Sequence, residues 1–270
     1  MPELPDLEAY RSFFDRRIPS VGIEAATVSI ALVVRAPKDD FIATLTGNAF
    51  GEVERRGKFI LFSLKSGNYL AIHPMLSGRF QYCPPKEKQR AKTCFTLALA
   101  NGQELRYFDE RLMGKVYLVK EGAFDAVPRF GELGPEPLSE ELTEEVFRER
   151  LRRFRSQIKN VILNETLVAG IGNAYADEIL FAAGIHPYRK RTELSAEDEG
   201  RLYRAIRSVL GEAAAIVTER MEKEGLPVAE YRDHLKVHRR GGQPCPNCGA
   251  SITEITAGQR ITNFCRHCQA

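Results

Sequence analysis

The sequence predicts an α+β protein in which strands come first, helices follow, and the last residues form a small cysteine-bearing module. Apolar residues recur at helical spacing over the first twenty positions and then alternate, as in strands, from about residue 22 to 120. Beyond a stretch rich in Gly and Pro at 131–137, the period is helical as far as about residue 224. We therefore expect three domains, at residues 1–130, 131–230 and 231–270.

An amphipathic helix is predicted near the N-terminus, directly after Pro2 and Glu3. Its apolar positions are three and four residues apart, and Pro19 ends the run because proline cannot continue a helix. The residues on this face are Leu7, Tyr10, Phe14 and Ile18.

The strand-rich segment carries one strong hairpin signal. Asn101 and Gly102 separate two alternating runs, and this dipeptide favours a type I′ turn because both residues tolerate positive φ. The clearest strands are expected at residues 59–64, 69–72, 95–100 and 104–108.

A helix is predicted at 174–183, with Asn173 as its N-cap and Gly184 at its end. Gly170 and Gly172 precede it and would let the backbone approach a ligand, so that the amides of the helix N-terminus could hold a phosphate. Tight packing between helices explains the two glycines equally well.

A second, longer helix is predicted to follow Ser195, which can cap it, and to end at Gly225 and Pro227. The apolar positions expected on one face are Leu202, Ile206, Val209, Ala213, Ile216 and Val217.

Composition and charge favour an ordinary globular protein that binds a polyanion. Of 270 residues 43% are hydrophobic, and the N-terminus lacks a secretory or membrane pattern, so we expect a cytoplasmic protein. The net charge of +3 is uneven: residues 148–160 and 231–270 are basic, whereas 131–145 are acidic. Basic patches suit duplex DNA, although such runs are often only solvated helix faces.

The cysteines of the C-terminal module predict a structural zinc site. Two Cys-x-x-Cys pairs, Cys245 with Cys248 and Cys265 with Cys268, have the spacing at which four thiolates surround one zinc. Four protein ligands leave no position open for water, so the zinc is expected to be structural. Cys83 and Cys94 lie outside this motif and are expected to be buried thiols.

Residues 251–264, between the two cysteine pairs, alternate as a β-hairpin does, with its tip at 257–260. Arg260 would project from this tip toward solvent or toward a phosphate. Spacing does not distinguish the two. His267 is expected at the surface.

Six motifs in order along the chain resemble those of the formamidopyrimidine-DNA glycosylase and endonuclease VIII family. The resemblance covers essentially the whole sequence and is closest to formamidopyrimidine-DNA glycosylase. The motifs lie at residues 2–8, 55–58, 73–78, 109–114, 170–173 and 245–268, the last containing Gln259 and Arg260.

The resemblance implies a β-sandwich domain, a helical domain with a helix-two-turn-helix, and a zinc-bound hairpin. It implies a bifunctional glycosylase and lyase acting on apurinic sites in base excision repair. Removal of Met1 would free the amine of Pro2 to form a Schiff base at C1′, and β,δ-elimination would follow. Glu3 would be the general acid, and Lys58 would bind phosphate and assist proton transfer.

The same resemblance implies a set of DNA contacts. Asn173 and Arg260 would clamp phosphates, and Arg260 would also be a catalytic residue. Leu76, Arg111 and Met113 would fill the void left by a flipped base. The other expected DNA contacts are His73, Lys92, Gly172 and Gln259.

Three departures from the family pattern concern lesion choice. Leu76 and Met113 replace a methionine and a phenylalanine of members acting on oxidised purines, unless both are core residues. Lys92 lies in a segment that carries a histidine in relatives. Residues 218–238 lack the Gly-Gly-Thr-Thr stretch before the loop that closes over 8-oxoguanine. Ring-opened purines are the first expectation, with 8-oxoguanine and oxidised pyrimidines open.

The expected partner is double-stranded DNA containing a damaged base or an abasic site, bound by a monomer associated with the nucleoid and not with a membrane. Besides one structural zinc, no nucleotide or redox cofactor is expected. Two competing hypotheses are a non-catalytic binder of kinked DNA and a zinc-ribbon protein that binds RNA or a protein. The second leaves the N-terminal motifs unexplained.

Overall fold

The computed structural model describes residues 1–257 and 260–269. The chain divides into two compact units. The first contains Met1–Gly131 together with Val217–Tyr231, and the second contains Glu132–Ile216 and the chain from Arg232 onward. The three-domain division stays a prediction.

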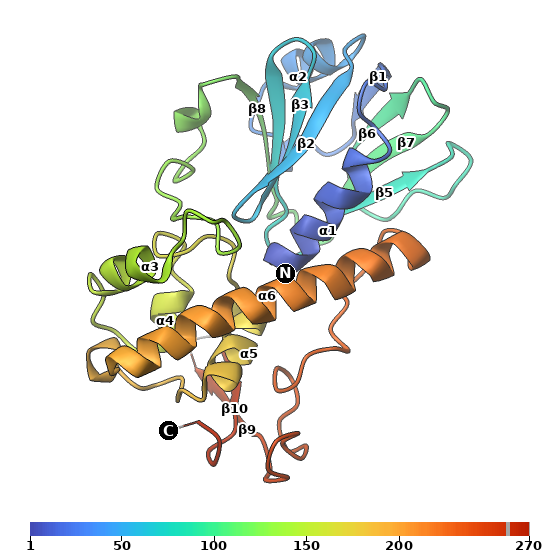
Figure 1. Cartoon of the computed structure of the whole chain (residues 1–270). Coiled ribbons are helices and arrows are strands. Elements are labelled where there is room, and N and C mark those ends of the chain that lie inside the picture. Colours follow the sequence, from blue (N-terminus) through green and yellow to red (C-terminus); the bar gives the residue numbers. More distant parts are fainter. Residues whose placement is uncertain (258–259, 270) are drawn as a thin grey trace. The chain divides into compact units, whose positions relative to one another are not determined.

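The first unit is a β-sandwich of two four-stranded antiparallel sheets with short helices (Figure 1). Its helices are α1 (Leu4–Asp15), η1 (Ala31–Val33), α2 (Lys38–Leu45) and η2 (Phe124–Ala126). Its strands are β1 (Ile23–Val28), β2 (Phe50–Arg56), β3 (Phe59–Leu64), β4 (Asn68–His73), β5 (Gly78–Cys83), β6 (Thr93–Leu99), β7 (Glu104–Asp109) and β8 (Lys115–Lys120). One sheet has the order β1-β6-β7-β5 and the other β2-β3-β4-β8.

Aromatic side chains from α1 and from both sheets fill the core of this unit. The ring of Phe14 lies 5.4 Å from that of Phe62 in β3 and 5.3 Å from that of Phe80 in β5. The helix is shorter than expected, because it ends at Asp15 and Ile18 is buried in the following turn. The amides of Arg17 and Ile18 both donate to the Phe14 carbonyl there, which closes the helix before Pro19.

The hairpin of β6 and β7 forms where expected, but the type I′ turn prediction is wrong. Gly102 has φ of 76°, whereas Asn101 is not among the residues with positive φ. The amide of Gly102 donates to the Leu99 carbonyl at 2.9 Å, as in a type I turn followed by a left-handed glycine. The loop is one residue longer than a two-residue turn, so only one position needs positive φ.

The second unit is helical and ends in a β-hairpin. Its elements are α3 (Glu144–Leu151), α4 (Ile158–Ile162), α5 (Asn173–Ala183), η3 (Arg191–Glu193), α6 (Ala196–Glu224), β9 (Thr253–Ala257) and β10 (Arg260–Phe264). The last residues of α6, from Val217, group with the first unit. No helix among residues 1–257 and 260–269 is long and apolar enough to cross a membrane.

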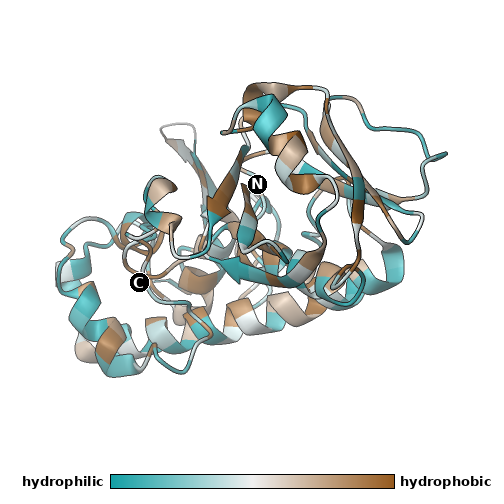
Figure 2. Cartoon of the chain, turned by 90° about the horizontal axis from the view of Figure 1, so that it is seen from above, coloured by the Kyte–Doolittle hydropathy of each residue, from teal (hydrophilic) through white to brown (hydrophobic). Residues whose placement is uncertain are grey.

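The long helix α6 begins as predicted. The Asp198 amide donates to Ser195 Oγ at 3.1 Å, and the Ser195 amide donates to the Asp198 carboxylate at 3.0 Å. Polar and apolar residues are interleaved along its length (Figure 2). Ile216 was placed on the wrong face, since its side chain is exposed, whereas Leu210 is buried.

Candidate active site and nucleic-acid interface

The N-terminus of the chain is buried against α1. The side chains of Pro2 and Glu3 are both buried, Glu3 with 2% of its surface exposed. Glu3 is extended and forms the N-cap of α1, where its amide donates to the Asp6 carboxylate at 2.8 Å. The cap holds Glu3 against the residue expected to carry the nucleophile.

Lys58 lies in the turn between β2 and β3, not on a strand. Gly57 has φ of 56°, which allows a two-residue hairpin in which Arg56 pairs with Phe59. The Lys58 side chain is buried, so Lys58 is not a solvated surface lysine.

Arg55 ties this turn to α1. Its guanidinium donates to the Gly57 carbonyl at 3.1 Å and to the Glu8 carboxylate at 3.1 Å. The turn that carries Lys58 therefore lies beside α1, the helix that Glu3 caps.

Glu230 contacts the N-terminal amine, and no motif in the sequence pointed to it. Its carboxylate lies 2.7 Å from the Met1 nitrogen and also accepts a hydrogen bond from Arg79. Burial raises the pKa of Glu230, but Arg79 and the N-terminal ammonium outweigh burial and lower it. Glu230 belongs to the segment that departs from the family pattern, where periodicity offers no signal.

Leu76 and Met113 are exposed on two loops of the first unit, at 36% and 41% of their surface. Leu76 lies between β4 and β5, and Met113 lies between β7 and β8 beside the exposed Arg111. Their exposure excludes the alternative that both are core residues.

His73 and Lys92 are held by these same loops. His73 Nδ1 accepts the amide of Met75 at 3.0 Å, and its ring packs edge-on against Phe59. The Lys92 ammonium donates to the carbonyl of Glu110. Both side chains expected to contact DNA therefore border the loops that carry Leu76 and Met113.

The N-cap of α5 is Gly172, so the prediction that Asn173 fills this position is wrong. Asn173 is the first helical residue, and its side-chain amide donates to the Ile261 carbonyl of β10 at 2.8 Å. The hairpin thus takes the side chain that would otherwise cap the helix. Asn173 Oδ1 is buried without a hydrogen-bond partner among the described residues, which leaves one acceptor at this helix end.

A buried ion pair also fixes the hairpin. Lys159 of α4 and Asp177 of α5 are 5% and 1% exposed, and their charged atoms lie 2.6 Å apart. Lys159 also donates to the Ile261 carbonyl at 3.0 Å and to Thr262 Oγ1 at 2.9 Å. Lys159 was counted in a basic patch facing a polyanion, but it is a buried residue that binds β10.

The carboxylates of α5 hold the segment that leads into the zinc module. Asp177 lies 2.7 Å from His238 Nδ1 and accepts the amide of Asn263 at 3.1 Å. Glu178 accepts three backbone amides, those of residues 236–238, each at 2.8 Å. Burial raises the pKa of Glu178 despite these hydrogen bonds. Arg260, exposed at the start of β10, is therefore carried on an anchored strand.

Asp177→Asn is expected to destabilise the second unit by about 3–5 kcal/mol, because it leaves the buried ammonium of Lys159 without its counter-charge. Urea unfolding followed by far-ultraviolet circular dichroism measures the change. Glu149→Gln removes an ion pair with Arg153 that is largely exposed on both sides, and we expect no measurable change from it. Equal unfolding curves for the two variants would contradict a structural role for the buried pair.

The remaining basic residues of 148–160 are only partly available to a ligand. Arg148 pairs with Glu144 at 2.6 Å, and Arg150 donates to the Leu167 carbonyl at 3.0 Å. Arg152 and Arg155 are exposed. The patch is thus partly a set of internal contacts and partly surface charge.

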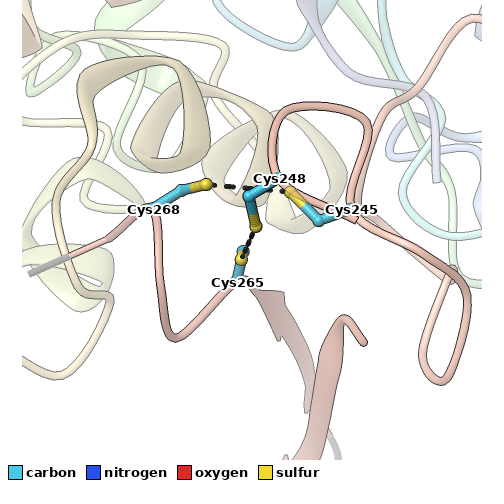
Figure 3. Close-up of side chains that lie close together, drawn as sticks. All are labelled: Cys245, Cys248, Cys265 and Cys268. Carbon is cyan, nitrogen blue, oxygen red and sulfur yellow. Dashed lines mark hydrogen bonds between the residues drawn. The ribbon is translucent and has the colours of Figure 1, made fainter. Parts of the chain in front are cut away.

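The four cysteines of the C-terminal module converge on one point (Figure 3). Their sulfur atoms all lie within 4.8 Å of one another, with 3.8 Å between Cys245 and Cys268 and 3.5 Å between Cys248 and Cys265. Tetrahedral zinc with Zn–S bonds of about 2.3 Å places its sulfurs about 3.8 Å apart. The thiols fit one structural zinc.

The other cysteine and hairpin predictions have mixed outcomes. Cys94 is buried, whereas Cys83 is only partly so, which corrects its expected burial. His267 is exposed as expected. The hairpin forms with Ala257 opposite Arg260. Gln259 lies outside the described residues.

Comparison with known proteins identifies the family. The formamidopyrimidine-DNA glycosylase N-terminal domain matches residues 1–116, the H2TH domain of that glycosylase matches 133–223, and a zinc finger found in FPG and IleRS matches 242–270. A relative from Pelotomaculum thermopropionicum, named formamidopyrimidine-DNA glycosylase, is 36% identical and covers 100% of this chain and 99% of its own. The chain belongs to the formamidopyrimidine-DNA glycosylase family.

Other members of this family match over their full length. The formamidopyrimidine-DNA glycosylase of Listeria innocua is 34% identical, with 100% of both chains covered. A crystal structure of Lactococcus lactis FPG with FAPY-dG-containing DNA has a TM-score of 0.89 at 29% identity, covering 99% of each chain. The MutM (FPG) protein of Thermus thermophilus has a TM-score of 0.87 at 32% identity, covering 99% of this chain and 98% of its own. The family resemblance and the α+β fold class are confirmed.

Proposed function

We propose that this chain is a bifunctional DNA glycosylase and lyase of base excision repair that removes oxidised bases from duplex DNA, formamidopyrimidines first. One observation carries the proposal: the chain matches proteins named formamidopyrimidine-DNA glycosylase over its whole length and keeps Pro2 and Glu3 buried at the start of α1. Solved relatives bound to DNA with a FAPY-dG or an abasic site support the substrate class.

Pro2 is the proposed nucleophile. Removal of Met1, which the small Pro2 side chain permits, converts the peptide nitrogen of Pro2 into a secondary amine. Because α-amino groups have a pKa of about 8, this nitrogen is partly unprotonated near neutral pH. The nitrogen lone pair forms a bond to C1′, and the damaged base leaves with the electrons of the glycosidic bond. Opening of the sugar ring then breaks the C1′–O4′ bond and leaves an iminium, which acidifies the C2′ proton. Loss of that proton expels the 3′ phosphate by β-elimination, and loss of a further proton from C4′ expels the 5′ phosphate by δ-elimination.

Glu3 and Lys58 assist at the same sugar. Glu3 donates a proton to the ring oxygen as the sugar opens, and the N-cap hydrogen bond to Asp6 fixes its backbone. Lys58 neutralises a phosphate beside the reacting sugar and assists proton transfer. Burial of both side chains, and the contacts of Arg55 with Glu8 and Gly57, support these roles.

Two groups of residues bind the DNA. Gly172, Asn173 and Arg260, with Gln259, clamp phosphates at the end of α5 and at the hairpin. His73 and Lys92 contact the backbone beside the lesion, and Leu76, Arg111 and Met113 fill the space that the flipped nucleotide leaves. The exposure of Leu76 and Met113 supports the second assignment.

Borohydride trapping tests the function. The purified protein, with Met1 removed, is mixed with duplexes carrying an abasic site, a ring-opened guanine, 8-oxoguanine or an oxidised pyrimidine. We expect a covalent adduct that peptide mass spectrometry maps to Pro2 and that is absent from a form retaining Met1. Binding to the abasic duplex without any adduct would overturn the enzyme and leave a damaged-DNA binder.

The lesion panel also ranks substrates, because residues 218–238 depart from the family pattern where relatives close a loop over the damaged base. We expect the ring-opened guanine to react fastest. Since the matched relatives are bacterial proteins, we also propose that the chain acts in the cytoplasm, associated with the nucleoid, as a monomer.

A further inference from the structure

One buried carboxylate joins the two loops that carry Leu76 and Met113. Asp109 ends β7 and has no exposed surface. Its Oδ1 accepts the hydroxyl of Ser77 and, at 3.1 Å, the amide of Arg111, and its Oδ2 accepts the amide of Gly114 at 2.6 Å. Ser77 follows Leu76, whereas Arg111 and Gly114 flank Met113, so one side chain bonds both loops.

The hydroxyl of Ser77 closes this link from the other side. Its oxygen accepts the amide of Arg111 at 3.0 Å while its proton goes to Asp109. A hydrogen bond to a buried carboxylate is stronger than one between neutral groups. The loop at 74–77 and the loop at 110–114 therefore share a closed set of hydrogen bonds.

Both loops pack closely against the same side chain, that of Tyr107. Gly78 and Gly114 both face the hydroxyl of Tyr107, and a Cβ at either position would overlap it. Burial raises the pKa of Tyr107, with Asp109 adding to the effect, so the phenol stays neutral. The Tyr107 ring is held in the core by Phe80 and Phe95, at 5.4 and 5.6 Å. The loops are thus seated on the core of the sandwich.

Each loop also contains a residue in the left-handed region directly before its apolar side chain. Met75, with φ of 51°, precedes Leu76, and Leu112, with φ of 53°, precedes Met113. Such conformations cost about 1–3 kcal/mol for residues other than glycine and persist only where surrounding contacts determine them. The Met75 amide donates to His73 Nδ1, the Leu112 amide donates to the Asp109 carbonyl, and the bonds to the Asp109 carboxylate fix the residues on either side.

We propose that Asp109 is a positioning residue that, through Ser77, makes Leu76, Arg111 and Met113 one rigid wedge for a DNA base step. The inference rests on the proposed function, since it requires duplex DNA with a displaced nucleotide. A wedge delivered as one body loses less conformational entropy on insertion than two independent loops do. Asp109 and Ser77 act through the loops and do not touch the reacting atoms.

Ser77→Ala removes the link while leaving Asp109 bonded to its own loop. The isosteric pair Ser77→Thr and Ser77→Val separates the hydroxyl from any effect of side-chain size. Ser63→Ala is the matched control, because it removes a serine hydroxyl that donates one hydrogen bond, to the Glu52 carbonyl at 2.9 Å, between the strands β2 and β3 and away from both loops. Thermal unfolding verifies that each variant is folded.

Two readouts report on the wedge. The first is the rate of borohydride-trapped adduct formation on an abasic duplex at saturating protein, and the second is the fluorescence change of 2-aminopurine placed opposite the abasic site. We expect Ser77→Ala and Ser77→Val to lower the rate about tenfold and to reduce the fluorescence change by half or more. Ser77→Thr and Ser63→Ala should stay within about twofold of the unsubstituted protein.

Equal rates and equal fluorescence for Ser77→Val and Ser77→Thr would overturn the proposal. So would a lower rate with an unchanged fluorescence signal, because the wedge would then be intact. If the unsubstituted protein forms no adduct on any duplex, the proposed function fails instead, and the fluorescence comparison of the Thr and Val variants still decides the wedge.

Discussion

Removal of zinc is expected to lower the affinity for an abasic duplex by at least about a hundredfold, because the metal supplies folding free energy that the C-terminal module lacks. The buried apolar cluster there consists of Phe181, Val237, Cys245, Ile252 and Cys265, so two of its five members are zinc ligands. Structural zinc contributes about 10–16 kcal/mol in zinc-finger peptides. Without it, Arg260 loses its fixed place on β10.

The measurement is fluorescence anisotropy of a labelled abasic duplex before and after chelation, with the zinc content determined in parallel. Cys265→Ser should reproduce the effect. Cys83→Ser is the matched control, because Cys83 is a partly buried thiol outside the zinc cluster. Metal-free protein that keeps its affinity would show that the contacts of Lys159 and Asp177 hold the hairpin without zinc.

The features that were predicted well from sequence are those set by residues close together in the chain. The spacing of the cysteine pairs specifies a metal site whatever surrounds it. The strand at 59–64 and the cap at Ser195 also depend on neighbours within a few positions, and both were confirmed. The expected catalytic and DNA-binding residues came from the family resemblance, which rests on short motifs in a fixed order along the chain.

What was missed depends on partners distant in sequence. Asn173 has the composition of an N-cap, but a carbonyl of β10, 88 residues later, takes its side chain. Lys159 lies in a basic run, yet Asp177 and Thr262 bury it. A charge pattern gives no information on which charges find internal partners.

Ile216 shows a different limit. One helical period was assumed for all of α6, but the residues from Val217 onward group with the first unit, and Val217 and Met221 pack into its core. A helix that serves two cores need not keep one apolar face along its length. Ile216 is the last residue of α6 that groups with the second unit.

Glu3→Gln is expected to slow adduct formation by about 10²–10⁴-fold, because glutamine has nearly the same shape but no proton to donate as the sugar opens. Glu3 is also the N-cap of α1, so a purely structural role is the competing explanation. Loss of a cap costs about 1 kcal/mol of stability and would shift the melting temperature rather than the chemical step. A catalytic role therefore predicts a change in the rate of adduct formation, whereas a capping role predicts a change in the melting temperature.

Single-turnover trapping on the abasic duplex gives the rate, anisotropy gives the affinity, and thermal unfolding gives the stability. We expect a large fall in rate with the affinity within about twofold of the unsubstituted protein, because the carboxylate acts at the sugar and not on the phosphates. Glu222→Gln serves as the control for loss of a carboxylate, since Glu222 lies on α6 and pairs with Arg17 in the turn after α1. A rate for Glu3→Gln equal to that of Glu222→Gln would leave Glu3 with only its capping role, and the proton for the ring oxygen would then have to come from solvent or from Lys58.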